Sequence, residues 1–210
     1  MIGMLRHKIG QCWKALRWQR EVRQAVSTQL ALLENPSIFA MGGLTDEEEA
    51  RLAALVRRAA AHDGPIVELG TLFGLTTLLI AAAARPGQRV IAIDNFCWNP
   101  FGLPPDLHEA FTRKVLRNEL AAGRVELARA ASADVRREWS GPPPAIVFLD
   151  ADHSYTAVRD EIAWAKALGV PIICGHDYGN ARFGATRAVD EAFGGDVEVH
   201  GMVWSWERPA

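Results

Sequence analysis

Two clusters of ionisable side chains directly follow apolar runs in the second half of the chain, and their residue types suit chemistry. Asp150 and His153 come after one run, and His176 and Asp177 come after another. Carboxylate oxygens favour magnesium, calcium or manganese, whereas an imidazole nitrogen tolerates zinc, iron or manganese. An imidazole with an ordinary pKa of about 6.5 can also accept a proton at neutral pH. The clusters therefore predict one shared site for a metal or for acid–base work.

Each cluster also has a purely structural interpretation. Asp152 and Ser154 can cap a helix that begins at Tyr155, and His176 can form a hydrogen bond inside the core. Acids and a histidine placed directly after four apolar residues are hard to explain by packing alone. We therefore favour a site over the structural interpretation.

The stretch 66–77, IVELGTLFGLTT, has the pattern of a buried strand, a glycine turn and the start of a helix. Its apolar run is interrupted by Glu68. Gly70 and Gly74 allow backbone conformations and a close ligand approach that a side chain would block. A helix that begins near Gly74 points its free N–H groups back at the loop. This stretch predicts a cradle for a nucleotide-type ligand.

Further polar residues stand at the ends of the next predicted strands. Asp94 and Asn95 lie roughly 20 residues after the glycine loop, the spacing at which a carboxylate grips a ribose diol. Ser132 and Asp134 either reach a base edge or merely cap the following helix, and the sequence leaves both readings open. In an open parallel sheet the ligand lies beyond the carboxyl ends of the strands, so these residues are expected at one edge.

The elements that must position these residues alternate along the chain. A helix is predicted over 45–61, with Thr45 and Glu48 forming its capping box. Strands are then predicted at 66–69, 89–94, 124–129, 145–150 and 170–175, and helices at 75–84, 106–121, 133–139, 155–168 and 184–193. This alternation, with an antiparallel hairpin about a His-Gly turn in 197–206, predicts an α/β, Rossmann-like fold: a seven-stranded, mostly parallel sheet with helices on both faces.

The composition bounds the class of protein. The near-balance of 23 basic and 25 acidic residues gives no sign of a nucleic-acid-binding surface. Three widely separated cysteines, Cys12, Cys97 and Cys174, argue for reduced thiols and against a disulfide frame. No stretch approaches the roughly 20 apolar residues of a membrane helix. We therefore expect a cytoplasmic protein without an integral membrane segment.

The first 40 residues are predicted to form a helical extension, and residues 41–210 the main domain. Apolar residues such as Leu5, Ile9 and Trp13 recur at helical spacing in the extension. We favour packing of this stripe on the domain or on a second copy of the chain, which would make a homo-oligomer. A basic amphipathic helix on a membrane surface is the alternative.

From about residue 40 to its end the chain resembles a class I S-adenosylmethionine-dependent methyltransferase. The pattern Glu68-x-Gly70-x-x-x-Gly74 is similar to the first motif of that family, whereas nicotinamide-binding turns usually follow G-x-G-x-x-G. Leu72 stands where the general pattern has its middle glycine. The small-molecule O-methyltransferases of the catechol type and the sugar O-methyltransferases of macrolide tailoring share this departure.

Two further segments narrow the resemblance. Residues 148–155, and residues 175–178 followed by 186–191, resemble a bacterial subgroup near the macrocin O-methyltransferase and cephalosporin hydroxylase families. The resemblance implies an S-adenosylmethionine site. Its cofactor-binding residues would be Glu68, Gly70, Thr71, Gly74, Asp94, Asn95, Ser132, Ala133 and Asp150.

The resemblance also implies roles in the reaction. In metal-dependent relatives the acid that ends the fourth strand and an acidic pair that ends the fifth bind magnesium, which implies Asp150, His176 and Asp177 here. His176 departs from that pattern, because a neutral imidazole is a poorer magnesium ligand than a carboxylate. His153 matches the histidine that takes the substrate hydroxyl proton in sugar-methylating relatives.

The leading hypothesis is O-methylation of a small hydroxylated molecule, a sugar or other secondary metabolite. His153 would act as base, with Asp150 beside it in the catalytic site, because an activated methyl group needs only an aligned acceptor and a base. A metal would instead lower the pKa of the acceptor hydroxyl. A catalytically inactive, cofactor-binding scaffold and a different metal chemistry are the alternatives. Loops 96–106 and 178–185 are expected to choose the acceptor.

Overall fold

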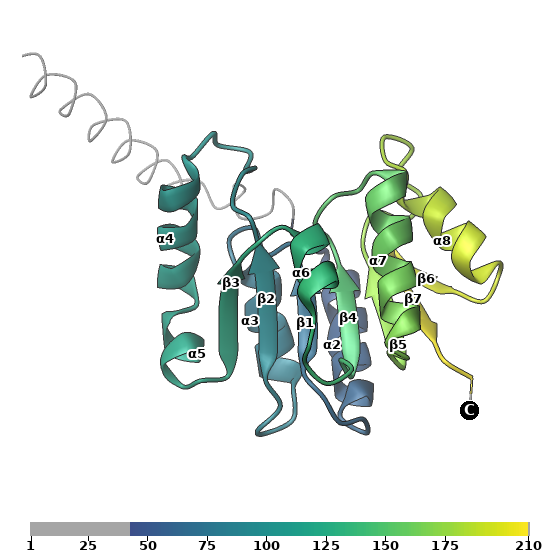
Figure 1. The fold of residues 1–210 in the computed structure, drawn as a ribbon, viewed down its shortest axis with the longest axis horizontal. Coiled ribbons are helices and arrows are strands. Elements are labelled where there is room, and N and C mark those ends of the chain that lie inside the picture. The colour runs from purple at the N-terminus through teal and green to yellow at the C-terminus, as the bar shows by residue number, and fades with distance from the viewer. Residues whose placement is uncertain (1–42, 210) are drawn as a thin grey trace, which may run out of the picture. The chain divides into compact units, whose positions relative to one another are not determined.

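A computed structural model describes residues 43–209 as a single twisted sheet between two layers of helices (Figure 1). The strands are β1 (Ile66–Leu69), β2 (Val90–Asp94), β3 (Val125–Arg129), β4 (Ile146–Leu149), β5 (Ile172–Gly175), β6 (Glu198–His200) and β7 (Val203–Glu207). The helices are α2 (Asp46–Ala59), α3 (Leu75–Ala83), α4 (Pro105–Val115), α5 (Arg117–Ala121), α6 (Ser132–Glu138), α7 (Tyr155–Ala167) and α8 (Ala185–Phe193).

The strand order is β3-β2-β1-β4-β5-β7-β6. Strands β1 to β5 are parallel, and β7 runs antiparallel to both β5 and β6. The predicted seven-stranded, mostly parallel sheet with an antiparallel hairpin at its edge is confirmed. The order reverses between β1 and β4, and this is the switch point where ligands bind in open α/β sheets.

Alternate residues of the central strands face the two helical layers. Ile66, Ile146 and Ile172 belong to the core that includes α2 and α3. Val67 and Val147 belong to the second core, which includes α7 and α8. Figure 1 shows α6, α7 and α8 in front of the sheet and α2 and α3 behind it. This period of two places Glu68 on the side of α3, inside the first core.

The predicted capping box at the start of α2 is present. The Thr45 hydroxyl accepts the Glu48 amide, and Glu48 accepts the Thr45 amide at 2.8 Å. Glu48 is also buried, and its other carboxylate oxygen accepts the amide of Met202 at 2.6 Å. One capping residue thus ties α2 to the turn of the β6–β7 hairpin. That turn consists of Gly201 and Met202, one residue later than the predicted His-Gly turn.

A single helix was predicted over 106–121, and here the prediction is wrong. Two helices, α4 and α5, meet at Leu116, whose φ of −84° and ψ of 5° end α4. The Leu116 side chain is fully buried in the first core. No proline or glycine marks the break, so it is tertiary burial that overrides the local preference for helix.

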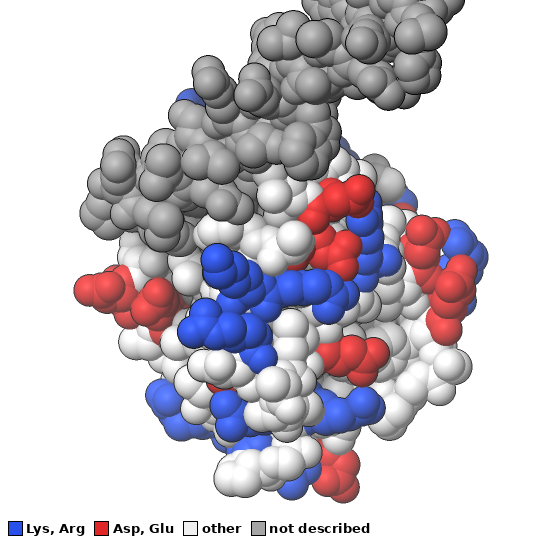
Figure 2. Space-filling model, turned by 90° about the vertical axis from the view of Figure 1, so that its left-hand side faces the viewer, with Lys and Arg blue, Asp and Glu red and all other residues white. Residues whose placement is uncertain are grey.

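The outer face of α4 and the adjoining β3 edge carry interspersed charges of both signs (Figure 2). Arg129 pairs with Asp106 at 2.7 Å, and Arg113 pairs with Glu109 at 2.8 Å. The opposite face of α4 is buried. Helix α4 is therefore amphipathic, with ion pairs toward solvent and His108 and Thr112 toward the interior.

Some sequence-based expectations fall outside the described residues. The helical extension over 1–40, the domain boundary that follows it, its pairing with a second copy and Cys12 are among them. Within the described residues, Cys97 and Cys174 are free thiols. None of the helices in residues 43–209 combines the length and apolar character needed to cross a membrane.

Candidate active site at the carboxyl ends of the strands

The ends of β1 and β4 meet at the switch point of the sheet. The Asp150 amide donates to the carbonyl oxygen of Leu69 at 2.8 Å. Gly70 has a φ of +90°, and a Cβ built on it would lie 2.1 Å from the Asp150 carbonyl oxygen. Only glycine fits there. The sequence suggested that Gly70 makes room for a ligand, and the structure shows that it makes room for the backbone of Asp150.

The loop between β1 and α3 is held by Asp94. One Asp94 oxygen accepts the amides of Thr71 and Leu72, each at 2.9 Å, and the other accepts the amide of Phe96 at 2.7 Å. Asp94 therefore fixes the shape of the loop. A carboxylate has about four lone-pair sites, so a ribose contact would add to these bonds. The neighbouring Asn95 accepts the amide of Cys97 at 2.8 Å.

Leu72 lies in the left-handed region with a φ of +47°. Its carbonyl oxygen accepts hydrogen bonds from His108 at 2.9 Å and Thr112 at 2.7 Å, both on α4. Neither His108 nor Thr112 was among the site residues predicted from the sequence. Their spacing of i and i+4 on a predicted helix was the only signal, and it did not show where that helix face would dock.

Glu68 is fully buried below the loop. One of its oxygens accepts the Thr77 hydroxyl, and the other has no hydrogen-bond partner among residues 43–209. Burial raises the pKa of Glu68 to about 8, helped by the charges of Asp150 and Asp94 and opposed by the Thr77 bond. The hydroxyl oxygen of Thr71 is likewise buried without a partner in the described part of the chain. These two orphaned polar atoms fit a polar, cationic ligand.

Ser132 is the first residue of α6 after β3, and because the N-cap is Ala131 with no side-chain cap hydrogen bond, the capping role considered for Ser132 is not seen. Ser132 forms a hydrogen bond with Glu161 of α7, which is 1% exposed. Burial raises the pKa of Glu161 to about 7, and the Ser132 bond opposes that shift. Asp134 pairs with Arg137 at 2.6 Å on the surface of α6. Asp134 therefore lies inside α6 and does not cap it, and its contact with a base edge stays a prediction.

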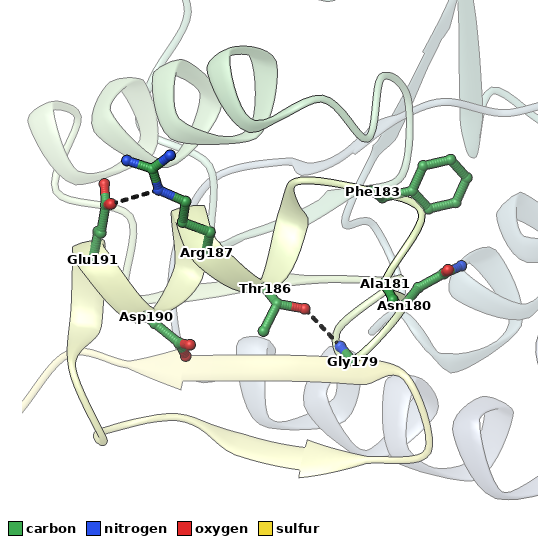
Figure 3. Close-up of a pocket in the computed structure, with 8 residues that line it drawn as sticks. All are labelled: Gly179, Asn180, Ala181, Phe183, Thr186, Arg187, Asp190 and Glu191. Atoms are coloured by element: carbon green, nitrogen blue, oxygen red, sulfur yellow. Dashed lines mark hydrogen bonds and ion pairs between the residues drawn. The ribbon is translucent and has the colours of Figure 1, made fainter.

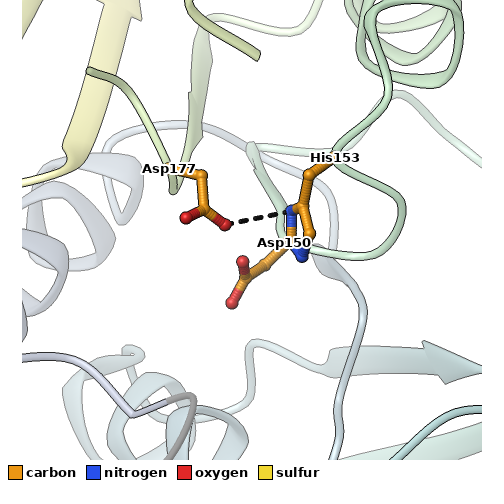
Figure 4. A group of neighbouring side chains, drawn as sticks. All are labelled: Asp150, His153 and Asp177. Carbon is orange, nitrogen blue, oxygen red and sulfur yellow. Dashed lines mark ion pairs between the residues drawn. The ribbon is translucent and has the colours of Figure 1, made fainter. Parts of the chain in front are cut away.

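The side chains of Asp150, His153 and Asp177 converge above β4 and β5 (Figure 4). Nδ1 of His153 lies 3.1 Å from Oδ2 of Asp177. One ligand-type atom from each of the three residues lies within 4.8 Å of the other two. Asn180 donates to the other Asp177 oxygen at 2.9 Å. Two strand-end loops are thus joined into one polar site, as the two sequence clusters predicted.

The protonation states of this site follow from its burial. Burial lowers the pKa of His153 below its usual 6.5, and the charge of Asp177 partly opposes this shift. Burial also raises the pKa of Asp150 to about 7, against the attraction of His176. Burial acts to raise the pKa of Asp177, but the nearby imidazoles of His176 and His153 and the hydrogen bond from Asn180 outweigh burial and hold this pKa below its ordinary value. His153 is therefore a neutral imidazole beside an ionised carboxylate at pH 7.

His176 does not join the three converging side chains as the third metal-type ligand. Its Nε2 lies 3.5 Å from Glu48, and its Nδ1 lies 3.7 Å from both Asp150 and Asp177. Burial opposes protonation of His176, but these acids raise its pKa. Among the described residues, the group with metal-ligand spacing contains His153 in its place. The buried carboxylate of Glu48 lies on the other side of the His176 ring, and no sequence pattern indicated that it lies here.

A hollow of about 410 Å³ lies beside this site, between the loop after β5 and α8 (Figure 3). Phe183 lines it and also lies against His153, with ring centroids 4.6 Å apart. The Gly184 amide donates to the His153 carbonyl oxygen at 2.9 Å. The hollow is lined by Gly179, Asn180, Ala181, Phe183, Thr186, Arg187, Asp190 and Glu191.

Comparison with known proteins assigns the chain to a family. Residues 67–178, more than half of the 210, match a family model described as a methyltransferase domain. The chain belongs to this methyltransferase family. The matched region of the methyltransferase includes the glycine loop, Asp94 and both polar clusters.

Similar proteins agree with this assignment. The methyltransferase is 29% identical over 130 residues to a catechol O-methyltransferase from Mycobacterium tuberculosis, covering 62% of this chain but only 49% of that relative. It therefore spans about half the length of the curated relative that it matches.

Two solved structures share the fold. The first is an O-methyltransferase from Bacillus cereus in complex with SAH, with 17% identity, a TM-score of 0.60, and 87% of this chain and 91% of that chain covered. The second is TomG from Streptomyces achromogenes, an O-methyltransferase involved in tomaymycin synthesis, in complex with SAM. Its sequence identity is 16% and its TM-score 0.60, with 89% of this chain and 90% of that chain covered. At these identities the likeness shows the fold alone.

The family resemblance drawn from the sequence is thus confirmed for the methyltransferase domain. Its narrower placement near the macrocin O-methyltransferase and cephalosporin hydroxylase families stays a prediction. Four residues near the site were not predicted from the sequence: His108, Thr112, Glu161 and Glu48, which lies beside His176.

Proposed function

We propose that this methyltransferase transfers a methyl group from S-adenosylmethionine to a hydroxyl oxygen of a small molecule, with His153 as the general base. The observation that carries the proposal is the pair of His153 and Asp177, whose Nδ1 and Oδ2 atoms lie 3.1 Å apart. A general base oriented by a second group is the arrangement that proton abstraction requires. Its place at the carboxyl ends of β4 and β5, next to the switch point, is where a ligand of this fold would lie.

The orphaned polar atoms below the glycine loop support the cofactor. S-adenosylmethionine carries a sulfonium cation and supplies an activated methyl group. The free oxygen of Glu68 and the hydroxyl of Thr71 can bind its polar end. A nearby cation would favour the ionised form of Glu68 and so offset the burial that raises its pKa. Ser132 and Ala133 at the start of α6 are proposed to contact the adenine, and Asp94 with Asn95 the ribose.

The tautomer of His153 follows from its partner. Because the Asp177 carboxylate accepts a hydrogen bond, Nδ1 of His153 carries the proton and Nε2 offers its lone pair. As the acceptor oxygen bonds to the methyl carbon, the bond from that carbon to the sulfonium sulfur would break, S-adenosylhomocysteine would leave, and the hydroxyl proton would pass to Nε2 of His153. The resulting imidazolium faces the ionised carboxylate of Asp177, which stabilises the new charge. Asp150, 17% exposed in its side chain, borders the same space and is proposed to orient the acceptor.

Metal-assisted transfer is the second candidate, because Asp150, His153 and Asp177 have metal-ligand spacing. Two carboxylates and one imidazole suit manganese, zinc or iron better than magnesium. A metal held there would lower the pKa of the acceptor hydroxyl, and it would occupy the histidine that otherwise acts as base. Chelation separates the two candidates: with His153 as base, turnover after EDTA treatment stays within about twofold. A loss that manganese restores would favour the metal.

The acceptor is proposed to be a small hydroxylated molecule with an apolar or ring-shaped face. Phe183 is 41% exposed and lies directly on His153, so a ring could pack on it while its hydroxyl meets the base. Sugars and other secondary metabolites fit this description. Relatives named for catechol methylation and for tomaymycin synthesis are compatible with it.

Calorimetry with S-adenosylmethionine, followed by a turnover screen of catechols, hydroxylated rings and sugars, tests the proposal. The wild-type protein is expected to bind the cofactor and methylate at least one class of acceptor. His153→Ala should abolish the transfer and leave cofactor affinity within about twofold. No affinity for the cofactor would refute the proposal. Binding without turnover of any acceptor would favour the catalytically inactive scaffold.

A further inference from the structure

Leu72 is the residue at which the glycine loop departs from the general methyltransferase pattern. The loop still turns as if a glycine were present, because Leu72 has a φ of +47°. Residues with a Cβ rarely adopt this left-handed conformation, and they do so only where surrounding contacts impose it. Leu72 must therefore be held in place by other parts of the chain.

The contacts that hold Leu72 act on both of its peptide groups. On one side, Asp94 accepts the Leu72 amide at 2.9 Å. On the other side, the Leu72 carbonyl oxygen accepts Nε2–H of His108 at 2.9 Å and the Thr112 hydroxyl at 2.7 Å. A carbonyl oxygen only accepts, so Nε2 of His108 must carry a proton. We call His108 and Thr112 the α4 clamp.

The α4 clamp lies deep inside the protein. His108 and Thr112 are both 0% exposed. The His108 ring also meets Phe73 and Phe96 edge-on, at centroid distances of 5.0 and 5.2 Å. Its Nδ1 has no hydrogen-bond partner among residues 43–209, so the bond to Leu72 is the single hydrogen bond of this ring within that region. A buried polar ring at a site where an apolar side chain would pack suggests that the bond itself is needed.

We propose that His108 and Thr112 are positioning residues for the cofactor. By holding the Leu72 carbonyl, they keep the loop from Thr71 to Gly74 in the shape that receives S-adenosylmethionine. This inference rests on the proposed function for its ligand, but the clamp itself is a property of this chain. Without the clamp, Leu72 returns to an ordinary backbone conformation and displaces the Thr71 hydroxyl above Glu68. Binding must then restore the loop, which weakens affinity.

Two matched pairs of variants test the role of the hydrogen bonds. His108→Gln keeps an N–H donor near the position of Nε2, whereas His108→Leu keeps the bulk and removes the donor. Thr112→Ser keeps the hydroxyl, whereas Thr112→Val removes it. Calorimetric titration with S-adenosylhomocysteine is expected to show about tenfold weaker binding for His108→Leu than for His108→Gln, with the same order for Thr112→Val and Thr112→Ser. The cofactor KM should rise more than kcat falls.

A second substitution distinguishes a role in positioning the glycine loop from a role in stabilising the whole fold. Glycine adopts the left-handed conformation without help, so Leu72→Gly in the His108→Leu background should recover most of the lost affinity. Glycine relieves the left-handed strain but makes the unfolded chain more flexible, and because these effects on the melting temperature oppose each other, affinity is the deciding measurement. Equal affinity of His108→Leu and His108→Gln, or a loss that Leu72→Gly leaves unchanged, would overturn the proposal. If His108→Leu does not fold, the difference in affinity between Thr112→Ser and Thr112→Val tests the proposal instead.

Amide hydrogen exchange tests the α4 clamp independently of the proposed function. In the protein without ligand, the Leu72 amide is expected to exchange faster in Thr112→Val than in Thr112→Ser. If the wild type does not bind S-adenosylhomocysteine, the proposed function fails and the exchange rates still decide whether the clamp holds the loop. Equal exchange in the two variants would refute the clamp even in a protein that binds the cofactor.

Discussion

Nδ1 of His153 lies 3.1 Å from Oδ2 of Asp177, across the ends of the neighbouring strands β4 and β5. Asp177 itself has a φ of +61° and accepts a second hydrogen bond from Asn180. A residue in this uncommon conformation is fixed by its surroundings. The geometry makes Asp177 an orienting anion for His153, and several measurable consequences follow from the site around it.

Replacing Asp177 by Asn is expected to lower kcat at least about tenfold, because the amide neither orients Nδ1–H as firmly nor stabilises the imidazolium. Cofactor affinity should change little. Steady-state kinetics with a responsive acceptor measures the effect. Asp160→Asn, on the outer surface of α7, is the matched control and should keep wild-type turnover. Wild-type kcat in Asp177→Asn would contradict the role given to this pair.

The pH profile of kcat/KM, which reports the free enzyme, is expected to rise with pH and to have its inflection below 6.5. The base works only when neutral, and burial lowers the pKa of His153 from 6.5. The Asp177 charge partly counteracts that shift, so Asp177→Asn should move the inflection to still lower pH. Measuring kcat/KM from pH 5 to 9 in the wild type and in Asp177→Asn shows in which direction the inflection moves. An inflection above 6.5 in the wild type, or one that moves upward in the variant, would exclude His153 as the base.

Glu68→Gln is expected to stabilise the ligand-free protein at alkaline pH. The pKa of Glu68 rises from 4.5 to about 8 in the fold, so the stability that this shift contributes is fully present below pH 4.5 and is lost as pH rises through about 8. Because glutamine does not ionise, the variant does not lose this stability at alkaline pH. Its melting temperature should exceed that of the wild type at pH 8.5 and differ less at pH 5. The same variant should bind S-adenosylmethionine more weakly.

Glu126→Gln serves as the control for that experiment, because Glu126 is exposed at the sheet edge. It should melt at the wild-type temperature at both values of pH. A Glu68→Gln variant that is less stable than the wild type at pH 8.5 would show that the buried carboxyl is ionised by contacts within the chain. Unchanged cofactor affinity would argue that the free oxygen of Glu68 does not face the cofactor.

Phe183→Ala is expected to raise the acceptor KM about fivefold and to leave the dissociation constant of the cofactor unchanged. The reason is that Phe183 is exposed and lies on His153, where an acceptor ring would pack. Val199→Ala, which trims an exposed apolar side chain on β6, is the control. Equal KM values in Phe183→Ala and the wild type would remove Phe183 from the acceptor site.

Much of the fold could be predicted because its signals are local. The alternation of apolar runs and helical patterns gave every strand, and Thr45 with Glu48 marked the start of α2. The glycine turn at Gly70 and the acids at the strand ends indicated which edge of the sheet carries the site. Parallel strands in one sheet place their carboxyl ends together, so polar residues at those ends had to gather there.

The tertiary structure alone decided which of those residues touch. His153 completes the group with metal-ligand spacing that contains Asp150 and Asp177, whereas His176 lies between these acids and Glu48 of α2. Leu72 keeps a glycine-like conformation because α4 brings His108 and Thr112 to its carbonyl oxygen. These contacts join residues far apart in sequence. Whether they form depends on how helices pack on the sheet and where each side chain then points, and no local pattern encodes that.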